Sequence, residues 1–400
     1  MTYDAIIVGA GPAGSTTARL LAREGAKVLL LDKQKFPRDK PCGGGVTLRA
    51  ASELDIDLTP VIEQTVFGAR FSLRLRKGFD RQFEKPLSYM TQRARLDSYL
   101  AECAAKAGAE FHDGEAVRAI NPQQVPVVRT DHGTYTSQVL IGADGANGVV
   151  AAATGLRPGA EHAVALEGNL PASGDLLEDW HDHIGMDLGD VAGGYGWVFP
   201  KGDHLNVGVG GWSYAGSMLR PKLARLARSH GFDPDKLEHL RGHRLPLRVP
   251  GTAIADGRVA LVGDAAGLID PLTGEGIHMA FASGRLVAES AISLLTGEVD
   301  NLSGYQRAVD YELQRELDAS ATLRELFHLA PPPYVALMRR NEKFWRFFCY
   351  LIRGDLTYVD FMRIIGPLRF AVNYLSAAAR RHREAKVAAG KRLLASGSAA

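Results

Sequence analysis

The chain has few cysteines and no long apolar run. Only three of its 400 residues are cysteine, Cys42, Cys103 and Cys349, and they form neither a Cys-x-x-Cys pair nor a metal-ligand spacing. This indicates neither a disulfide framework nor a metal site and fits the reducing cytoplasm. No apolar run reaches the roughly 18 residues of a membrane span, and the first expected strand starts too near Met1 for a signal peptide. We therefore expect a cytoplasmic protein, with contact at a membrane surface left open.

The net charge is also small. Lys and Arg number 47 and Asp and Glu 45, and the resulting charge of +2 gives no concentrated basic field for nucleic acid. With 46% hydrophobic and 23% charged side chains, the composition is that of a globular protein with a large core. A chain of this length predicts two intertwined domains.

A glycine-rich turn follows the first expected strand. Gly9, Gly11 and Gly14 stand between an apolar run at residues 3–8 and a helical pattern at residues 13–23. Missing side chains at this spacing allow a tight turn, close approach of a pyrophosphate and close packing of the helix. The turn therefore predicts a nucleotide-binding βαβ unit.

Two neighbouring features strengthen this interpretation. The helix N-terminus, with Ala13 in its first turn, supplies backbone N–H donors and a positive dipole end for phosphates. Asp32, which lies 18 residues after Gly14 at the end of the second expected strand, is placed to accept a hydrogen bond from a ribose hydroxyl. No second strand, Gly-x-Gly-x-x-Gly and helix unit occurs, so reductases with a separate NAD(P)H domain are disfavoured.

A second glycine and acid segment lies late in the chain. Asp264 follows an apolar strand at residues 259–262, from which its carboxylate could accept hydrogen bonds from a ribityl chain. A helix expected over residues 274–295 begins with Gly274, Gly276 and Ile277, whose N–H groups could stabilise a reduced flavin ring. Beside the N-terminal turn, these fragments predict one extended cofactor, FAD.

Arg93 lies at the start of a helix expected over residues 93–107, a position from which its guanidinium could reach flavin or phosphate. A surface salt bridge is the alternative, and Arg95 competes for the same role. Asp144-Gly145, after a central strand, supports the ribose and pyrophosphate region or forms only a turn.

The hydrophobic periodicity predicts an α/β protein. We expect a Rossmann-like FAD-binding domain, an inserted antiparallel β-sheet substrate domain and a C-terminal helical region. The predicted limits are 1–65, 93–160 and 251–300 for the discontinuous FAD-binding domain, 66–92 and 161–250 for the substrate domain, and 301–400 for the helical cap.

Two motifs narrow the class of flavoprotein. The general glycine pattern resembles the large superfamily that contains aromatic hydroxylases, flavin halogenases and geranylgeranyl reductases. Residues 40–45, Lys-Pro-Cys-Gly-Gly-Gly, and residues 195–200, Tyr-Gly-Trp-Val-Phe-Pro, resemble the Cys-Gly-Gly-Gly and Tyr-x-Trp-x-Phe-Pro signatures of the geranylgeranyl reductases. The resemblance spans residues 1–300.

The resemblance implies an FAD enzyme that saturates carbon–carbon double bonds of geranylgeranyl chains on a pigment, lipid or quinone. Cys42 would stand close to flavin and substrate and is the candidate proton donor, and Tyr195 and Trp197 would line the isoprenoid tunnel. The positions it implies at FAD are Ala13, Asp32, Gly43, Gly45, Arg93, Val117, Asp264, Gly276 and Ile277.

Each of these roles has an alternative. Cys42 could be a packing residue, and the aromatic residues of 195–200 could belong to an ordinary core face. Two other functions fit the scaffold: a flavin monooxygenase or halogenase, and a flavin carrier that reduces no substrate. A halogenase is expected to have Trp-x-Trp-x-Ile-Pro, from which Tyr195 and Phe199 depart.

The C-terminal region is expected to be helical, with aromatic residues followed by basic ones. This pattern fits either peripheral membrane contact or packing onto the other domains with a solvated tail. Electrons would come from NAD(P)H or a small redox protein, and the substrate would be an isoprenoid lipid or prenylated small molecule. The basic residues are Arg380, Arg381, Arg383, Lys386, Lys391 and Arg392.

Overall fold

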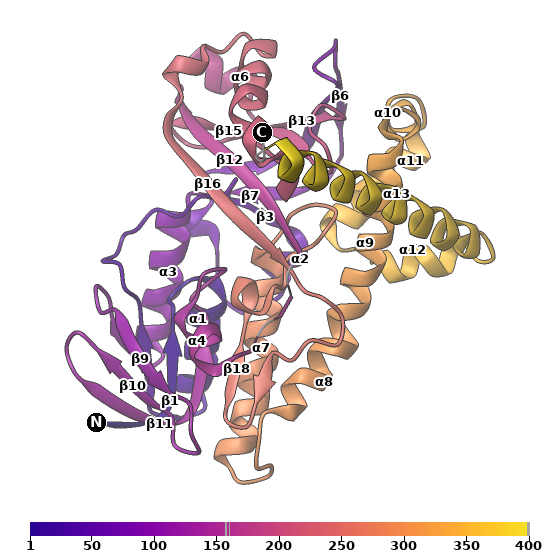
Figure 1. Ribbon diagram of the computed structural model, residues 1–400. Helices are drawn as coiled ribbons and strands as arrows, with labels where there is room; N and C mark the ends of the chain where they lie inside the picture. The colour runs from indigo at the N-terminus through magenta and orange to yellow at the C-terminus, as the bar shows by residue number, and fades with distance from the viewer. Residues whose placement is uncertain (157, 160, 398–400) are drawn as a thin grey trace.

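The computed structural model describes residues 1–156, 158–159 and 161–397, and its first unit is a largely parallel sheet (Figure 1). Strand β2 is buried along its whole length, which explains its continuous apolar run. Parallel strands occur in the order β18 (Val259–Leu261), β11 (Thr134–Gly142), β1 (Thr2–Val8), β2 (Val28–Leu31) and β8 (Glu110–His112). Antiparallel partners are β17 (Ala255–Asp256), on β18, and β9 (Val117–Asn121) and β10 (Val127–Thr130), beside β11.

Helices α1 and α7 pack against each other and share a core with this sheet, and α3 packs against α1. The sequence forms α1 because Pro12 occupies the first helical turn directly after the glycine turn. The helices of this unit are α1 (Pro12–Arg23), α3 (Arg93–Lys106), α4 (Val149–Thr154) and α7 (Ile277–Leu295), with the short 3-10 helix η4 (Gly263–Ala266).

A second sheet of seven strands carries the other unit. It is antiparallel except for the parallel pair of β5 and β13. Its order is β16 (Glu238–Leu247), β12 (Glu161–Pro171), β15 (His204–Trp212), β14 (Tyr195–Pro200), β13 (His183–Leu188), β5 (Gly68–Leu73) and β6 (Phe79–Gln82). Connecting helices are α5 (Asp175–Asp179), α6 (Leu219–Ser229), η2 (Ser213–Met218) and η3 (Pro234–Lys236).

A small three-stranded sheet and a short helix come from residues 45–90, a stretch that also contains β5 and β6 of the second sheet. The strands pair in the order β3 (Gly45–Thr47), β7 (Ser88–Met90) and β4 (Gln64–Val66), and they are accompanied by α2 (Leu48–Ser52) and η1 (Thr59–Val61). The domain limits predicted from the sequence remain a proposal.

The C-terminal residues are helical, as expected, and pack onto both units (Figure 1). Tyr305 on α8 is fully buried in the core of the first sheet, and Trp345 on α11 stacks edge-on against Phe71 of β5. The aromatic residues of α11 therefore pack internally. The helices are α8 (Ser303–Glu312), α9 (Gln314–Leu329), α10 (Pro331–Arg340), α11 (Glu342–Arg353), α12 (Tyr358–Ile364) and α13 (Leu368–Gly397). The side chains of Lys386, Lys391 and Arg392 lie outside the described residues.

None of the described helices combines the length and apolar character needed to cross a bilayer.

One expected helix start was wrong. The helix expected from residue 274 begins at Ile277, because Gly274 has a left-handed φ of +73° that no helix interior accepts. Helix α2 begins at Leu48, because Thr47 ends β3 and its hydroxyl caps the helix by accepting a hydrogen bond from the Ala50 N–H (3.1 Å).

Candidate flavin and substrate site

The glycine turn between β1 and α1 has no room for side chains. A Cβ added at Gly9, where φ is +104°, would lie 2.3 Å from the Ala143 carbonyl oxygen. A Cβ added at Gly14 would lie 1.9 Å from the Gly9 carbonyl oxygen. Gly11 is the N-cap of α1 and provides no side-chain cap to the helix. The free N–H groups of the first helical turn are therefore available to an anionic ligand.

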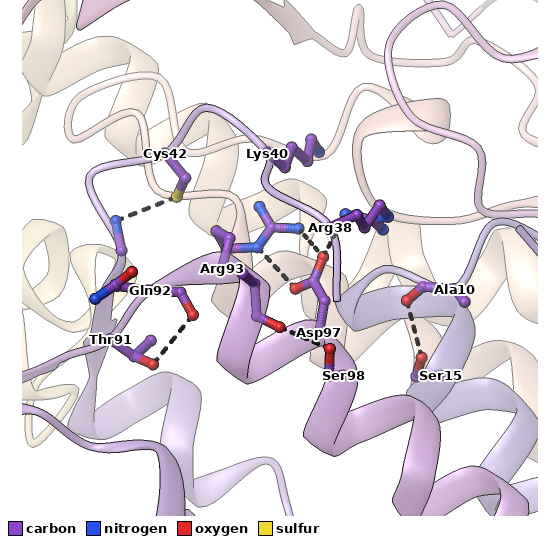
Figure 2. Close-up of polar contacts among 12 residues, drawn as sticks. Ala10, Ser15, Arg38, Lys40, Cys42, Thr91, Gln92, Arg93, Asp97 and Ser98 are labelled. Atoms are coloured by element: carbon purple, nitrogen blue, oxygen red, sulfur yellow. Dashed lines mark hydrogen bonds and ion pairs between the residues drawn. The ribbon is translucent and has the colours of Figure 1, made fainter. Parts of the chain in front are cut away.

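Two guanidinium groups lie near this helix end. The atoms nearest to an added Cβ at Gly11 are Nη2 of Arg38 at 3.7 Å and Nη2 of Arg93 at 3.9 Å. Both arginines bind fully buried Asp97, Arg93 through two contacts of 2.8 Å and Arg38 through one of 2.8 Å (Figure 2). Burial alone would lower the pKa of Arg93, but the attraction of Asp97 raises it, so Arg93 stays charged. Arg95, in contrast, is half exposed and pairs with Glu63.

Asp32 ends β2 beside the same turn. Its carboxylate accepts hydrogen bonds from the N–H groups of Ala10 (3.0 Å) and Gln34 (3.0 Å) and lies 3.3 Å from Arg38 Nη2. Arg38 Nε also donates to the same oxygen, Oδ2, whereas Oδ1 accepts only from Gln34 among the described residues, so Oδ1 retains a lone pair for a ribose hydroxyl. Val117 begins β9 and packs against the core of the first sheet.

Asp144 serves the fold through the turn before α4. One of its oxygens accepts a hydrogen bond from the Val150 N–H (3.0 Å), and the other is buried and has no partner in the described part of the chain. Burial raises the pKa of this carboxyl.

Asp264 lies in η4, close to the start of α7. Burial alone would raise its pKa, but Lys40 (3.2 Å) and His243 (3.6 Å) lower it well below the usual range. An added Cβ at Gly276, the N-cap of α7, would lie 3.2 Å from Asp264 Oδ1. Gly274 precedes this N-cap and Ile277 is buried in the first turn of α7. The segment from Asp264 to Ile277 is thus a compact loop that leads into α7, with its backbone N–H donors at the start of that helix.

The loop that contains Cys42 lies against strand β14. An added Cβ at Gly43 would lie 2.7 and 2.9 Å from two ring carbons of Phe199 and 3.5 Å from Trp197 Nε1. Lys201, just after β14, donates a hydrogen bond from Nζ to the Gly43 carbonyl (2.5 Å). The half-buried thiol of Cys42 accepts one from the Gly44 N–H (3.4 Å), as Figure 2 shows. Gly45 continues the chain into β3.

The two motifs of the sequence therefore meet in space. Tyr195, Trp197 and Phe199 follow one another along a single face of β14, with ring centroids 6.0 and 6.2 Å apart. Trp197 donates to Asn206 Oδ1 (2.8 Å), and the hydroxyl of Tyr195 donates to the Thr273 carbonyl (2.5 Å). Burial raises the pKa of Tyr195, so the phenol stays neutral.

A polar cavity of about 390 Å³ opens beside Cys42. Its walls come from the loop at residues 39–42, the start of α3, and strands β12, β15 and β16. Two buried charged residues in these walls, Glu167 and Lys201, were missed by the sequence analysis. Their only signals were an acid inside a largely apolar strand segment, for Glu167, and a base directly after the Tyr-x-Trp-x-Phe-Pro motif, for Lys201.

Burial has opposite effects on these two groups. It raises the pKa of Glu167 to about 7, and it lowers the pKa of Lys201 to about 8. Both therefore titrate near neutral pH, a property common at functional sites.

Comparison with known proteins agrees with this geometry. Residues 2–183 match the family model described as an FAD binding domain. Geranylgeranyl diphosphate reductase of Rhodobacter capsulatus is 35% identical over 309 residues, which cover 74% of this chain and 76% of that protein. Menaquinone reductase of Mycolicibacterium smegmatis is 33% identical over 314 residues, covering 72% and 75%. The chain belongs to the geranylgeranyl reductase family of FAD-dependent oxidoreductases.

Solved structures extend this agreement to the fold. A geranylgeranyl bacteriochlorophyll reductase-like protein of Thermoplasma acidophilum has a TM-score of 0.72 at 26% identity, covering 82% of this chain and 88% of that one. The flavin-dependent brominase Bmp2, with a TM-score of 0.66 at 17% identity, covers 88% of this chain and 94% of its own and shares the fold alone. The family and its α/β fold are those expected from the sequence.

The residues present fit FAD. The side-chain-free turn at Gly9 and Gly14 leaves room for a pyrophosphate, and the uncapped end of α1 with two adjacent guanidinium groups supplies positive charge. The chain is therefore an FAD-dependent oxidoreductase of this family.

Proposed function

We propose that this protein saturates carbon–carbon double bonds of a geranylgeranyl or related isoprenoid chain carried by a lipid, pigment or quinone. The observation that carries the proposal is the contact between the Cys-Gly-Gly-Gly loop and the aromatic face of β14. This contact brings the loop of Cys42 to the aromatic side chains of β14, near Arg93, Asp264 and the other residues that we propose bind flavin. The names of two relatives, a geranylgeranyl diphosphate reductase and a menaquinone reductase, support this substrate class.

Groups on several elements would hold FAD. The helix end at α1 and Arg93 would bind the pyrophosphate, Asp32 the ribose, and Asp264 the ribityl chain. When bound and reduced, FAD supplies the hydride that an isolated alkene needs. The full set proposed to contact FAD is Gly9, Gly11, Ala13, Gly14, Asp32, Gly43, Gly45, Arg93, Val117, Asp264, Gly274, Gly276 and Ile277.

The side chains beside the flavin would orient the alkene and protonate it. Trp197 and Tyr195 present apolar ring surface to an isoprenoid chain, because their polar atoms are already bound to Asn206 and Thr273. The thiol of Cys42 would give its proton to one alkene carbon while the other carbon takes hydride. Electrons would reach the flavin from NAD(P)H or a small redox protein.

We further propose that the protein works in the cytoplasm, peripheral to the inner face of a membrane, where isoprenoid lipids reside. The corner between α12 and α13 carries apolar side chains in solvent: Leu368 and Phe370 are each 67% exposed and Tyr374 is 70% exposed. Exposed Arg363 and Arg369 lie in the same segment. Apolar side chains flanked by cations favour an anionic lipid surface. Vesicle flotation tests this, since Phe370→Ser should weaken binding to anionic vesicles and zwitterionic vesicles should bind less.

An anaerobic reaction tests the enzymatic proposal. The FAD-loaded protein is reduced with dithionite and mixed with geranylgeranyl diphosphate, and flavin absorbance and product mass are followed together. We expect the flavin to be reoxidised as the product gains two hydrogens for each double bond. Cys42→Ala should slow this step while FAD stays bound. Reoxidation only after oxygen is admitted, together with an oxygenated or halogenated product from another substrate, would instead indicate a monooxygenase or halogenase.

A further inference from the structure

A buried carboxyl group lies directly behind Cys42. Glu167, on β12, accepts a hydrogen bond at Oε1 from the backbone N–H of Cys42 (2.5 Å) and lines the polar cavity. Its side chain is only 8% exposed. It is in register with Gly208 on β15, which in turn is in register with Trp197 on β14. The carboxyl therefore shares one row of the sheet with the aromatic wall and touches the residue proposed to protonate the alkene.

Holding the loop does not require an acid at this position. A glutamine oxygen would accept the Cys42 N–H equally well and would avoid the cost of burying an ionisable group. The acidic proton of Glu167 can exchange with solvent water through the cavity, which at about 390 Å³ has room for roughly ten water molecules. A carboxyl placed between solvent and a proton donor is suited to proton transfer.

We propose that Glu167 is the proton source of the site and passes its proton through Cys42 to the substrate. This inference rests on the proposed reduction of an alkene. Three bonds separate the Cys42 nitrogen from its sulfur, so the carboxyl and the thiol lie within roughly 6 Å, a span that one water can bridge.

The transfer is balanced in atoms and electrons. As the S–H bond of Cys42 breaks and a C–H bond forms at one alkene carbon, the Glu167 O–H proton moves through the bridging water to the sulfur and restores the thiol. The other carbon takes the hydride, which oxidises the flavin by two electrons and reduces the alkene by two. Glu167 is left as a carboxylate and regains a proton from water in the cavity. A carboxylate carries the resulting charge better than a thiolate, because a thiol is ordinarily the weaker acid.

Several charged groups face the same cavity and shape the pH dependence. Lys201 and Arg93 are also buried, and Nζ of Lys201 is held on the Gly43 carbonyl. Arg241 stands opposite Glu167 in the strand register and pairs with Asp39. Further basic groups are Lys40, His204 and His239, and further acidic groups are Asp203 and Glu238.

A pH profile of the single-turnover reaction tests the proposal. The FAD-loaded, dithionite-reduced protein is mixed with geranylgeranyl diphosphate between pH 5.5 and 9, and flavin reoxidation is timed. We expect the wild-type rate to fall above neutral pH. Glu167→Gln should be slower by about 100-fold, a typical loss for a general acid, and its profile should lose that fall. Glu167→Asp should keep a pH-dependent profile, because it retains a carboxyl group.

Two further variants separate the outcomes. Glu178→Gln, which removes an exposed carboxyl on α5 outside the cavity lining, is the matched control and should leave the profile unchanged. The inference would be overturned if the pH profile of Glu167→Gln matched that of wild type. It would also be overturned if the fall in rate above neutral pH disappeared in Lys201→Gln but not in Glu167→Gln, since the proton would then come from the ammonium. Absence of reoxidation in the wild-type protein would instead refute the proposed function. The FAD absorbance of each variant shows that its flavin site is formed.

Discussion

Substituting Gly43 by Ala tests the contact on which the proposed site depends. The backbone at Gly43 is outside the left-handed region, so alanine is conformationally allowed. Its Cβ, however, would lie 2.7 Å from Phe199 Cδ2, where an ordinary contact is at least 3.4 Å. The ring or the loop must therefore shift by about 0.7 Å, the difference between these two distances.

The expected effects differ for stability and for catalysis. Overpacking of this kind costs about 1–3 kcal/mol, and the lower entropy of the unfolded chain with alanine returns about 0.4–1 kcal/mol. We expect Gly43→Ala to lower the free energy of unfolding by about 1–2 kcal/mol. A displacement approaching 1 Å at a catalytic loop can reduce the rate by about 100-fold. Flavin content should fall less than in Gly14→Ala, because the turn at Gly9 and Gly14 is not altered.

Urea denaturation and single-turnover alkene reduction measure the two effects. Phe199→Leu in the Gly43→Ala background should recover part of the stability and the rate, because it removes the ring that the methyl group meets. Gly133→Ala is the control, since its Cβ would meet nothing nearer than 3.7 Å. Wild-type stability and rate in Gly43→Ala, with no gain from Phe199→Leu, would refute the reasoning.

Three other perturbations have defined outcomes. Gly14→Ala should yield protein without flavin absorbance, since its Cβ would lie 1.9 Å from the Gly9 oxygen; retention of FAD would contradict the proposed cradle. The pKa of Glu167 is raised to about 7 from an ordinary 4.5, so the stabilisation of the folded state by the neutral acid is present at low pH and lost as pH rises through 7. We therefore expect the free energy of unfolding of FAD-free Glu167→Gln, measured in urea relative to wild type, to rise by about 2–3 kcal/mol from pH 5 to pH 8. A difference from wild type that does not vary with pH would be inconsistent with this burial. Burial raises the pKa of Cys349 to about 12, so mass spectrometry should find it unmodified by iodoacetamide until the protein unfolds.

The sequence predicted those parts of the fold and site whose signals are local. The glycine turn could be identified because its three glycines, the preceding strand and the following helix lie within about two dozen residues and obey fixed spacings. Arg93 was preferred over Arg95 only on position, and the structure separates them by burial. The proposed roles of these residues at FAD remain predictions.

Other parts depend on contacts between distant segments. Gly43 meets Phe199 across 156 residues of sequence, and no local pattern encodes that pairing. Strand β16 was not predicted, because its first five side chains are exposed and therefore show no alternation of burial. Glu167 interrupts an apolar strand and could equally have faced solvent, so only the fold reveals its burial beside Cys42.

The same distant contacts explain how this scaffold holds loops in a fixed geometry. Three hydrogen bonds join loops of the nucleotide-binding unit to the second sheet, at or directly after its strands: Cys42 N–H to Glu167, the Gly43 carbonyl to Lys201, and the Thr273 carbonyl to Tyr195. Each of them places a loop backbone at a strand whose own neighbours are fixed by ladder hydrogen bonds. The cofactor cradle at the β1–α1 turn lies outside this set. We therefore expect a perturbation of the second sheet to lower the rate of reduction more than it lowers the flavin content.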